Sequence, residues 1–184
     1  MRLIIGISGS SGAIYGVRLL ELARTIPGLD THLVMTAAAK VTLAIETGRT
    51  PKDVERLATH VHDVRDLAAS ISSGSFQTEG MIVAPCSIKT LSSIANCHSD
   101  NLLSRAADVV LKERRRLVLL VRETPLHVGH CRLLLQASEM GAVVMPPVPA
   151  FYTGPKTLDD IVDHTCGRAL DLLGMDAGVV KRWD

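Results

Sequence analysis

Short hydrophobic runs alternate along the chain with amphipathic stretches. Five short segments that are apolar almost throughout have the length of buried β-strands: 3–7, 32–35, 81–84, 117–121 and 142–145. Between and after them, apolar residues recur three or four positions apart, which predicts helices around 14–23, 41–45, 91–94, 102–110, 126–140 and 158–172. Segment 49–79 is the least regular, with a short helix expected at 53–58.

Strands that are apolar throughout, each followed by a helix, predict a parallel sheet covered on both faces. We therefore expect one α/β domain with a doubly wound, Rossmann-like (flavodoxin-like) sheet. Ligands of such domains bind beyond the carboxyl ends of the strands, near the point where the strand order reverses. Candidate functional residues should therefore follow strands, at 8–12, 35–37, 85–90, 122–125 and 146–154.

Composition narrows the class of protein. The 184 residues include 20 Lys and Arg against 19 Asp and Glu, a formal net charge of +1, and aromatic residues make up only 3%. Nucleic-acid binding depends on a basic excess and on stacking aromatics, so we expect no nucleic-acid partner. The cysteines at 86, 97, 131 and 166 form no zinc or disulfide spacing.

The ends and the hydropathy of the chain indicate its compartment. No secretory signal precedes the first apolar run. The longest uninterrupted apolar run, 117–121, is far shorter than the roughly 20 residues that span a bilayer. We therefore expect a cytoplasmic protein without a membrane span.

Small residues join the first strand to the first helix, in the order Gly9-Ser10-Ser11-Gly12. Free amides at a helix N-terminus favour a phosphate, and the two hydroxyls add donors. The spacing matches neither G-x-G-x-x-G nor a P-loop. Phosphate binding is favoured over a simple tight turn. Ser87 follows the third predicted strand as a plausible N-cap, and Cys86 is more typical of a small buried thiol than of a nucleophile.

Several other positions carry charge or metal-type ligands. Arg122 and Glu123 follow the fourth predicted strand directly. Arg168 interrupts an apolar seam along the last predicted helix, which requires an internal carboxylate, a subunit contact or a phosphate ligand. His127 and His130 match no metal-site spacing, so we expect no metal. The small-polar stretch 70–75 is either a solvated connector or a loop that covers a ligand.

These segments together resemble the UbiX flavin prenyltransferases. The resemblance covers almost the whole chain in matching order and is carried by GISGSSGAIYG at 6–16, ISSGSF at 71–76, PCS at 85–87, RAADVVLKER at 105–114, RETPL at 122–126 and PAFY at 149–152. It implies a single FMN-binding flavoprotein domain over 1–184. It also implies an enzyme that joins the dimethylallyl group of dimethylallyl monophosphate to N5 and C6 of reduced FMN, without a metal.

The resemblance also implies partners and site residues. Prenylated FMN would serve a UbiD-type decarboxylase, in ubiquinone synthesis or aromatic-acid breakdown, and the enzyme would be a homo-oligomer, a dodecamer in the family, with sites shared between subunits. FMN contacts by position would be Gly9, Ser10, Ser11, Thr36, Ser87, Ile88, Lys89, Thr90 and Arg122. The prenyl phosphate would be held by Lys112, Arg122, Tyr152 and Arg168.

The remaining implied roles concern proton handling and closure. Glu46 and Glu123 would handle protons or place the substrate, Lys112 would take part in catalysis, and Trp183 would close over the site. Thr36-Ala37 stands where the family commonly has Ser-Lys, which keeps the hydroxyl and removes a cation. Two alternatives stay open, an FMN-dependent cysteine decarboxylase of related fold and a non-catalytic FMN carrier.

Overall fold

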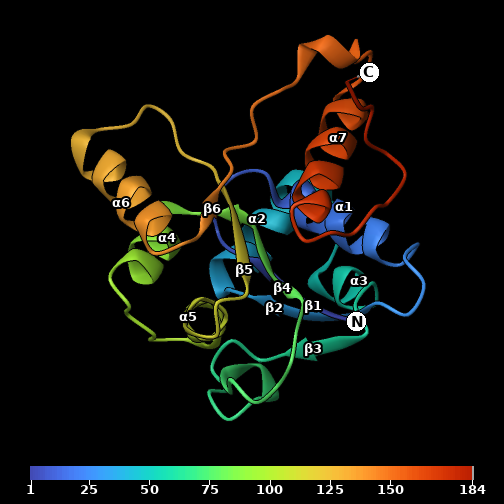
Figure 1. Cartoon of the computed structure of the whole chain (residues 1–184). Coiled ribbons are helices and arrows are strands. Elements are labelled where there is room, and N and C mark those ends of the chain that lie inside the picture. The colour runs from blue at the N-terminus through green and yellow to red at the C-terminus, as the bar shows by residue number, and fades with distance from the viewer. Residues whose placement is uncertain (184) are drawn as a thin grey trace.

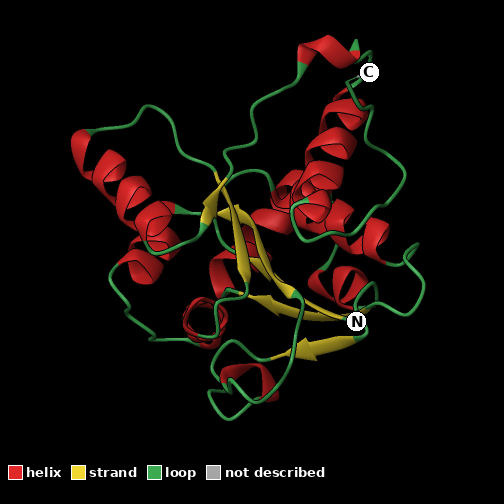
Figure 2. Cartoon of the chain, in the orientation of Figure 1, coloured by secondary structure: helices red, strands yellow, loops and turns green. Residues whose placement is uncertain are grey.

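The computed structural model describes residues 1–183, which form a parallel sheet between two layers of helices (Figures 1 and 2). Within these residues the sheet has six strands in the order β3-β2-β1-β4-β5-β6. The strands are β1 (Arg2–Ile7), β2 (Asp30–Met35), β3 (His60–His62), β4 (Gly80–Cys86), β5 (Arg116–Val121) and β6 (Val143–Val144). The helices are α1 (Ala13–Ala23), α2 (Ala37–Thr47), α3 (Pro51–Glu55), α4 (Ile88–Ala95), α5 (Leu102–Lys112), α6 (Val128–Glu139) and α7 (Leu158–Asp171), with 3-10 turns η1 (Ser70–Ser72) and η2 (Phe151–Thr153).

All neighbouring strands pair in parallel. β1 lies at the centre, with β2 on one side and β4 on the other, so the chain fills one half of the sheet before it crosses to the second half. This reversal makes the crevice beyond the carboxyl ends of β1 and β4 the ligand-binding position of the fold. The predicted doubly wound α/β architecture is confirmed.

Alternate side chains of each central strand enter opposite cores. Leu3, Ile5 and Ile7 face α1, α2, α3 and α7, whereas Ile4 faces the core built by α4, α5 and α6. Each buried leucine or isoleucine contributes about 1.5–3 kcal/mol to folding. Gly16 has no Cβ that would meet the Ala84 carbonyl oxygen at 2.5 Å, so α1 packs directly on the sheet.

Four details differ from the sequence-based expectations. The strand β3 was not predicted, α3 begins at residue 51 rather than 53, and β4 continues through Cys86. The predicted apolar seam of α7 holds only in part: Thr165 is buried, but Leu158 is 80% exposed, and the buried stripe also includes Val162, Cys166 and Ala169. Leu158 is the first residue of α7, and the buried residues of this helix begin only at Val162.

A helix that crosses a membrane must be both long and apolar. In residues 1–183, none of the helices combines the length and apolarity that crossing a bilayer requires.

Candidate active site

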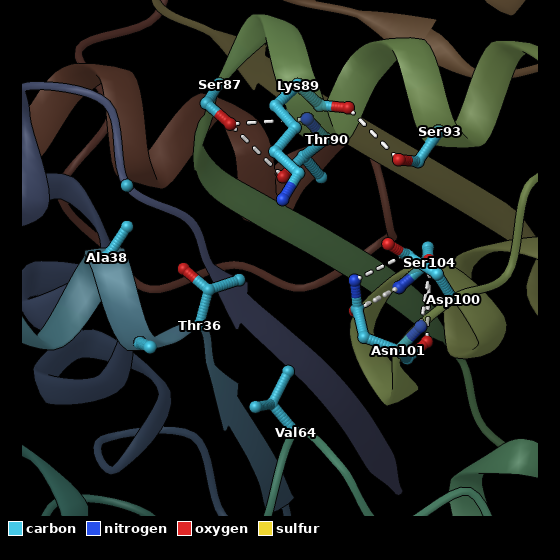
Figure 3. Close-up of a pocket in the computed structure, with 12 residues that line it drawn as sticks. Thr36, Ala38, Val64, Ser87, Lys89, Thr90, Ser93, Asp100, Asn101 and Ser104 are labelled. Atoms are coloured by element: carbon cyan, nitrogen blue, oxygen red, sulfur yellow. Dashed lines mark hydrogen bonds between the residues drawn. The ribbon is translucent and has the colours of Figure 1, made fainter.

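A cavity of about 590 Å³ lies beyond the carboxyl ends of β1, β2 and β4, at the reversal of strand order (Figure 3). Its walls come from segments far apart in sequence: Gly9, Thr36, Ala37, Ala38, Val64, Ser87, Lys89, Thr90, Ser93, Asp100, Asn101 and Ser104. Five of the predicted flavin contacts are therefore brought together, namely Gly9, Thr36, Ser87, Lys89 and Thr90. Ile88, another predicted contact, packs against the core below α4 instead of lining the cavity.

Two helix caps orient hydroxyl groups at this cavity. Thr36 is the N-cap of α2 and accepts a hydrogen bond from the Ala39 amide at 3.1 Å. Ser87 is the N-cap of α4, as predicted, and accepts from the Thr90 amide at 3.3 Å. The Ser87 amide donates to Ser8 Oγ at 2.7 Å, which ties the loop after β4 to the end of β1. The two positive helix ends therefore face one cavity.

The turn after β1 is arranged differently from the prediction. Glu46 Oε2 accepts from the amides of Gly12 and Ala13, each at 2.9 Å, so these two amides at the start of α1 are not free for a phosphate. Burial raises the pKa of Glu46, but hydrogen bonds from Ser11, Gly12 and Ala13 outweigh that effect and lower it overall. The carboxylate is thus ionised and caps the helix. Phosphate binding at this turn must rest on Ser10 and Ser11.

Ser10 has the unsatisfied group that such a role requires. Its Oγ is buried and has no hydrogen-bond partner within the described chain. With Ser11, Arg122 and Glu123, it lines a hollow of about 290 Å³ beside the turn. Arg122 Nε donates to the Ser11 carbonyl at 3.2 Å, which places the guanidinium over the start of α1. Glu123 lies exposed at the rim of the same hollow.

The C-terminal arm, residues 150–183, carries three further predicted residues: Tyr152, Arg168 and Trp183. The Tyr152 ring on η2 lies edge-on to Trp183, with centroids 5.2 Å apart, and Tyr152 Oη lies 3.4 Å from His164 Nε2 on α7. Arg168 follows His164 by one helical turn and donates to Asp171 at 2.8 Å. An internal carboxylate therefore partners Arg168, one of the alternatives that the sequence left open.

Lys112 lies at the opposite end of the sheet from the cavity, near the amino ends of the strands. It ends α5, immediately before β5 begins, and lines a hollow of about 420 Å³ with Arg114, Arg115 and Arg116. β5 then runs for six residues, each rising about 3.3 Å, before the chain reaches Arg122. One protomer therefore does not bring Lys112 to Arg122. Lys112 forms its ion pair with Glu113, the next residue in the sequence, and not with Asp108, which lies one helical turn earlier.

The remaining candidate residues, Cys86, His127 and His130, show no arrangement typical of a nucleophile or a metal site. Cys86 is fully buried, and burial raises the pKa of its thiol far above its usual range, in agreement with a structural role. The rings of His127 and His130 lie against each other with centroids 3.6 Å apart and their planes tilted by 34°. In the described part of the chain, no group of three or more His, Cys, Asp or Glu side chains is arranged to hold a metal ion.

Sequence reasoning missed the wall that faces the two helix caps. Asp100, Asn101 and Ser104 line it at the start of α5, where Asn101 Oδ1 accepts from the Ser104 amide at 3.1 Å (Figure 3). Asn is a preferred N-cap residue, so Asn101 immediately before an apolar helix was the available signal. Because α5 does not directly follow a strand, the pattern of loops after strands did not include it.

The cavity suits a molecule with a phosphate, several hydroxyl groups and an apolar body. Hydroxyls from Thr36, Ser87 and Thr90 and the Lys89 ammonium provide donors, Ser10 adds an unsatisfied hydroxyl beside it, and Ala38 and Val64 supply apolar contact. FMN has these parts. A doubly wound α/β sheet with such a cavity is typical of flavoproteins that bind a flavin nucleotide. The flavoprotein family model matches residues 1–170.

Known relatives narrow this class further. The flavin prenyltransferase UbiX of Escherichia coli K12 is 64% identical over 184 residues, covering 99% of this chain and 97% of the relative. A dodecameric FMN-dependent UbiX-like decarboxylase from Escherichia coli O157:H7 superposes with a TM-score of 0.97 at 50% identity, over 100% of both chains. AnUbiX in complex with FMN and dimethylallyl pyrophosphate gives 0.97 at 47%, over 100% of this chain and 97% of the other. The chain belongs to the UbiX flavin prenyltransferases.

Proposed function

We propose that this enzyme transfers the dimethylallyl group of dimethylallyl monophosphate to reduced FMN. The single observation that carries the proposal is the hydroxyl-lined cavity at the strand reversal in a chain of this family. Reduced FMN supplies the nucleophile: N5 bonds to C1 of the dimethylallyl group as the C1–O bond to phosphate breaks, and N5 loses its proton. Protonation of the remaining double bond at C2 then lets C3 bond to C6, which loses its proton as the fourth ring closes. No metal is required for this chemistry.

The first task of the protein is to bind and orient the flavin. Hydroxyls of Thr36 and Ser87 lie at the N-termini of two helices, where an anionic or hydroxyl-rich ligand is stabilised. Ser10, Ser11 and Arg122 extend these donors along the turn after β1. Holding the flavin edge against the allylic carbon supplies the orientation that a bimolecular step lacks in water.

The second task is to stabilise the leaving phosphate. In this proposal, the cations of Lys112, Arg122 and Arg168 and the Tyr152 hydroxyl contact the phosphate oxygens, on which negative charge gathers as the allylic bond breaks. Trp183, stacked edge-on against Tyr152, covers the reacting groups. Glu123, exposed beside Arg122, handles protons, whereas Glu46 fixes the turn that carries Ser11.

A complete site then requires more than one copy of the chain. Lys112 lies at the edge of the sheet opposite Arg122, so a neighbouring protomer must supply one of them. We assign the enzyme a homo-oligomer with shared sites, and a dodecamer by analogy with the relative of that size. Exposed apolar residues on α2 and before α7, including Val41, Ile45 and Phe151, offer surfaces for such contacts.

The product requires an acceptor. We assign prenylated FMN to a UbiD-type decarboxylase of ubiquinone synthesis or aromatic-acid degradation, and place the enzyme in the cytoplasm. All four cysteines are unpaired in the described chain, which agrees with a reducing compartment.

Anaerobic incubation with FMN, dithionite and dimethylallyl monophosphate, followed by mass spectrometry of the extracted flavin, tests this function. A gain of one C5H8 unit is the expected result, and the treated flavin should activate an apo UbiD-type decarboxylase. Bound but unmodified FMN, alongside an active control enzyme, would instead support a flavin carrier or a cysteine decarboxylase. Dimethylallyl pyrophosphate in a parallel reaction measures the preference for the monophosphate.

A further inference from the structure

We propose that Arg115 and the Gly74 loop (residues 73–76) form a clamp that positions the Lys112 ammonium for the prenyl phosphate. This inference rests on the proposed function, because it assigns Lys112 to the phosphate. Arg115 is a positioning residue in this arrangement: it contacts the loop and acts on the substrate through Lys112.

Arg115 binds the loop through its main chain. Its Nη1 donates to the Phe76 carbonyl oxygen and its Nη2 to the Gly74 carbonyl oxygen, both at 2.8 Å. The Arg115 amide also donates to the Val110 carbonyl at 2.9 Å, so the same residue closes the end of α5. A planar guanidinium can span two carbonyl groups with fixed geometry, which a lysine ammonium does not reproduce. Arg115 therefore links the loop rigidly to the helix end that carries Lys112.

Gly74 lies directly against the Lys112 side chain. A Cβ built on Gly74 would meet Lys112 Nζ at 2.8 Å and would come closer still to Glu113 Oε1. Real Cβ atoms essentially never approach within 3.0 Å, so only glycine leaves room for the Lys112–Glu113 ion pair in its present place. Gly74 has no left-handed φ, so its lack of a side chain, and not its backbone freedom, is what the contact requires.

We infer that the contact between Gly74 and Lys112 restricts the conformations of the Lys112 side chain. The Lys112 side chain is 46% exposed and ends a helix, where a free lysine samples many rotamers. Glu113 on one side and the Gly74 loop on the other restrict the ammonium before substrate arrives. Because an ordered cation loses less entropy on binding, the clamp should strengthen phosphate binding. The flavin cavity of the same protomer lies at the other edge of the sheet and should not respond.

Steady-state kinetics of Gly74→Ala and Arg115→Met in the full-length oligomer test the clamp. We expect the KM for dimethylallyl monophosphate to rise about tenfold in each variant, with kcat and the Kd for FMN within about twofold of the wild type. Arg115→Lys should not restore the KM, because it lacks the second donor. In Gly74→Ala the added methyl meets only the ends of flexible side chains, so its Tm should be unchanged.

Arg114→Met is the matched control. Arg114 lines the same hollow, but within residues 1–183 its side chain makes no hydrogen bond or ion pair. An equal rise of KM in this control, or a wild-type KM in Gly74→Ala, overturns the clamp. Lys112→Met separates the two proposals: a wild-type KM there removes Lys112 from the proposed site, whereas a lost activity there with wild-type Gly74→Ala overturns only the clamp. If Arg115→Met fails to fold, Gly74→Ala decides.

Discussion

At the scale of single residues, Glu46 shows how one carboxylate shapes the turn that carries Ser10 and Ser11. Its two hydrogen bonds to the amides of Gly12 and Ala13 act as an N-cap supplied from another helix. We expect Glu46→Gln to lower the free energy of unfolding by about 1 kcal/mol at pH 7, the usual effect of a lost cap. Urea denaturation measures this change, and Glu139→Gln, on an exposed residue, is the control.

The pH dependence of the same variant follows from the lowered pKa of Glu46. A depressed folded-state pKa gives stability that is present above the unfolded value and is lost as pH falls through the folded value. The difference between wild type and Glu46→Gln should therefore shrink as the pH falls below about 4.5, the ordinary pKa of a glutamate. A difference that stays constant down to pH 3 would contradict the assignment of an ionised cap.

Arg168 gives a second prediction at this scale. Arg168 and Arg182 both donate to Asp171, so removing Arg168 leaves that carboxylate with a cation at 3.0 Å. We expect Arg168→Ala to retain FMN binding and Tm but to lower kcat/KM for prenyl transfer at least about 100-fold, as loss of a charged transition-state contact does. Arg182→Ala removes the other partner of Asp171 and should retain transfer. Turnover equal to wild type in Arg168→Ala would remove Arg168 from the phosphate set.

At the scale of elements, the edge strand β3 depends on histidine packing. His32 on β2 is 4% exposed and its Nδ1 lies 2.9 Å from Nε2 of His62 on β3, while its ring stacks on His60 with centroids 4.5 Å apart. Burial, together with the neighbouring His60 and His62, lowers the pKa of His32 to about 4. The neutral ring is thus part of the contact that holds β3 on the sheet.

We expect this contact to make the fold sensitive to acid. A lowered histidine pKa means that the unfolded chain takes up a proton first, so stability falls as the pH drops from about 6.5 towards 4. The His32 contribution should amount to about 1–2 kcal/mol at pH 5. His32→Phe, which retains a stacked ring without a titratable group, should reduce this loss in urea titrations at pH 7 and pH 5. An identical pH slope in both proteins would contradict it.

The same element shows what the sequence does not reveal. The four long strands, β1, β2, β4 and β5, and the two-residue β6 lie in apolar runs that predict them directly. β3 has only three residues, two of them histidines, and its place depends on pairing with β2, which local pattern does not encode. In α7, spacing alone did not decide which of two adjacent stripes faces the sheet. Only the position of the helix shows that Leu158 lies outside the core.

At the scale of the whole molecule, the predicted site residues lie in three separate places in the fold, and their order in the sequence does not show this separation. Thr36 and Ser87 follow parallel strands, which end on the same side of the sheet, and both line the cavity there. Lys112 was grouped with them by resemblance, yet it lies at the amino edge of the sheet. Tyr152 and Trp183 contact each other on the C-terminal arm, and the η2 turn that carries Tyr152 lies away from the sheet (orange in Figure 1). Which parts meet in the working enzyme depends on neighbouring protomers.

Mixed oligomers test this division. Lys112→Met and Arg168→Ala should each lower transfer at least about 100-fold, because each removes one cation from every shared site. If the two residues of a site come from different protomers, oligomers co-expressed from equal amounts of both variants should regain activity in about a quarter of their sites, since random assembly pairs an intact Lys112 with an intact Arg168 at that frequency. Activity is measured by prenylated flavin formed per protomer. As a control, mixing the two purified oligomers without exchange of subunits should restore no activity. Co-expressed oligomers that remain inactive would mean that both residues act within one chain or that one of them lies outside the site.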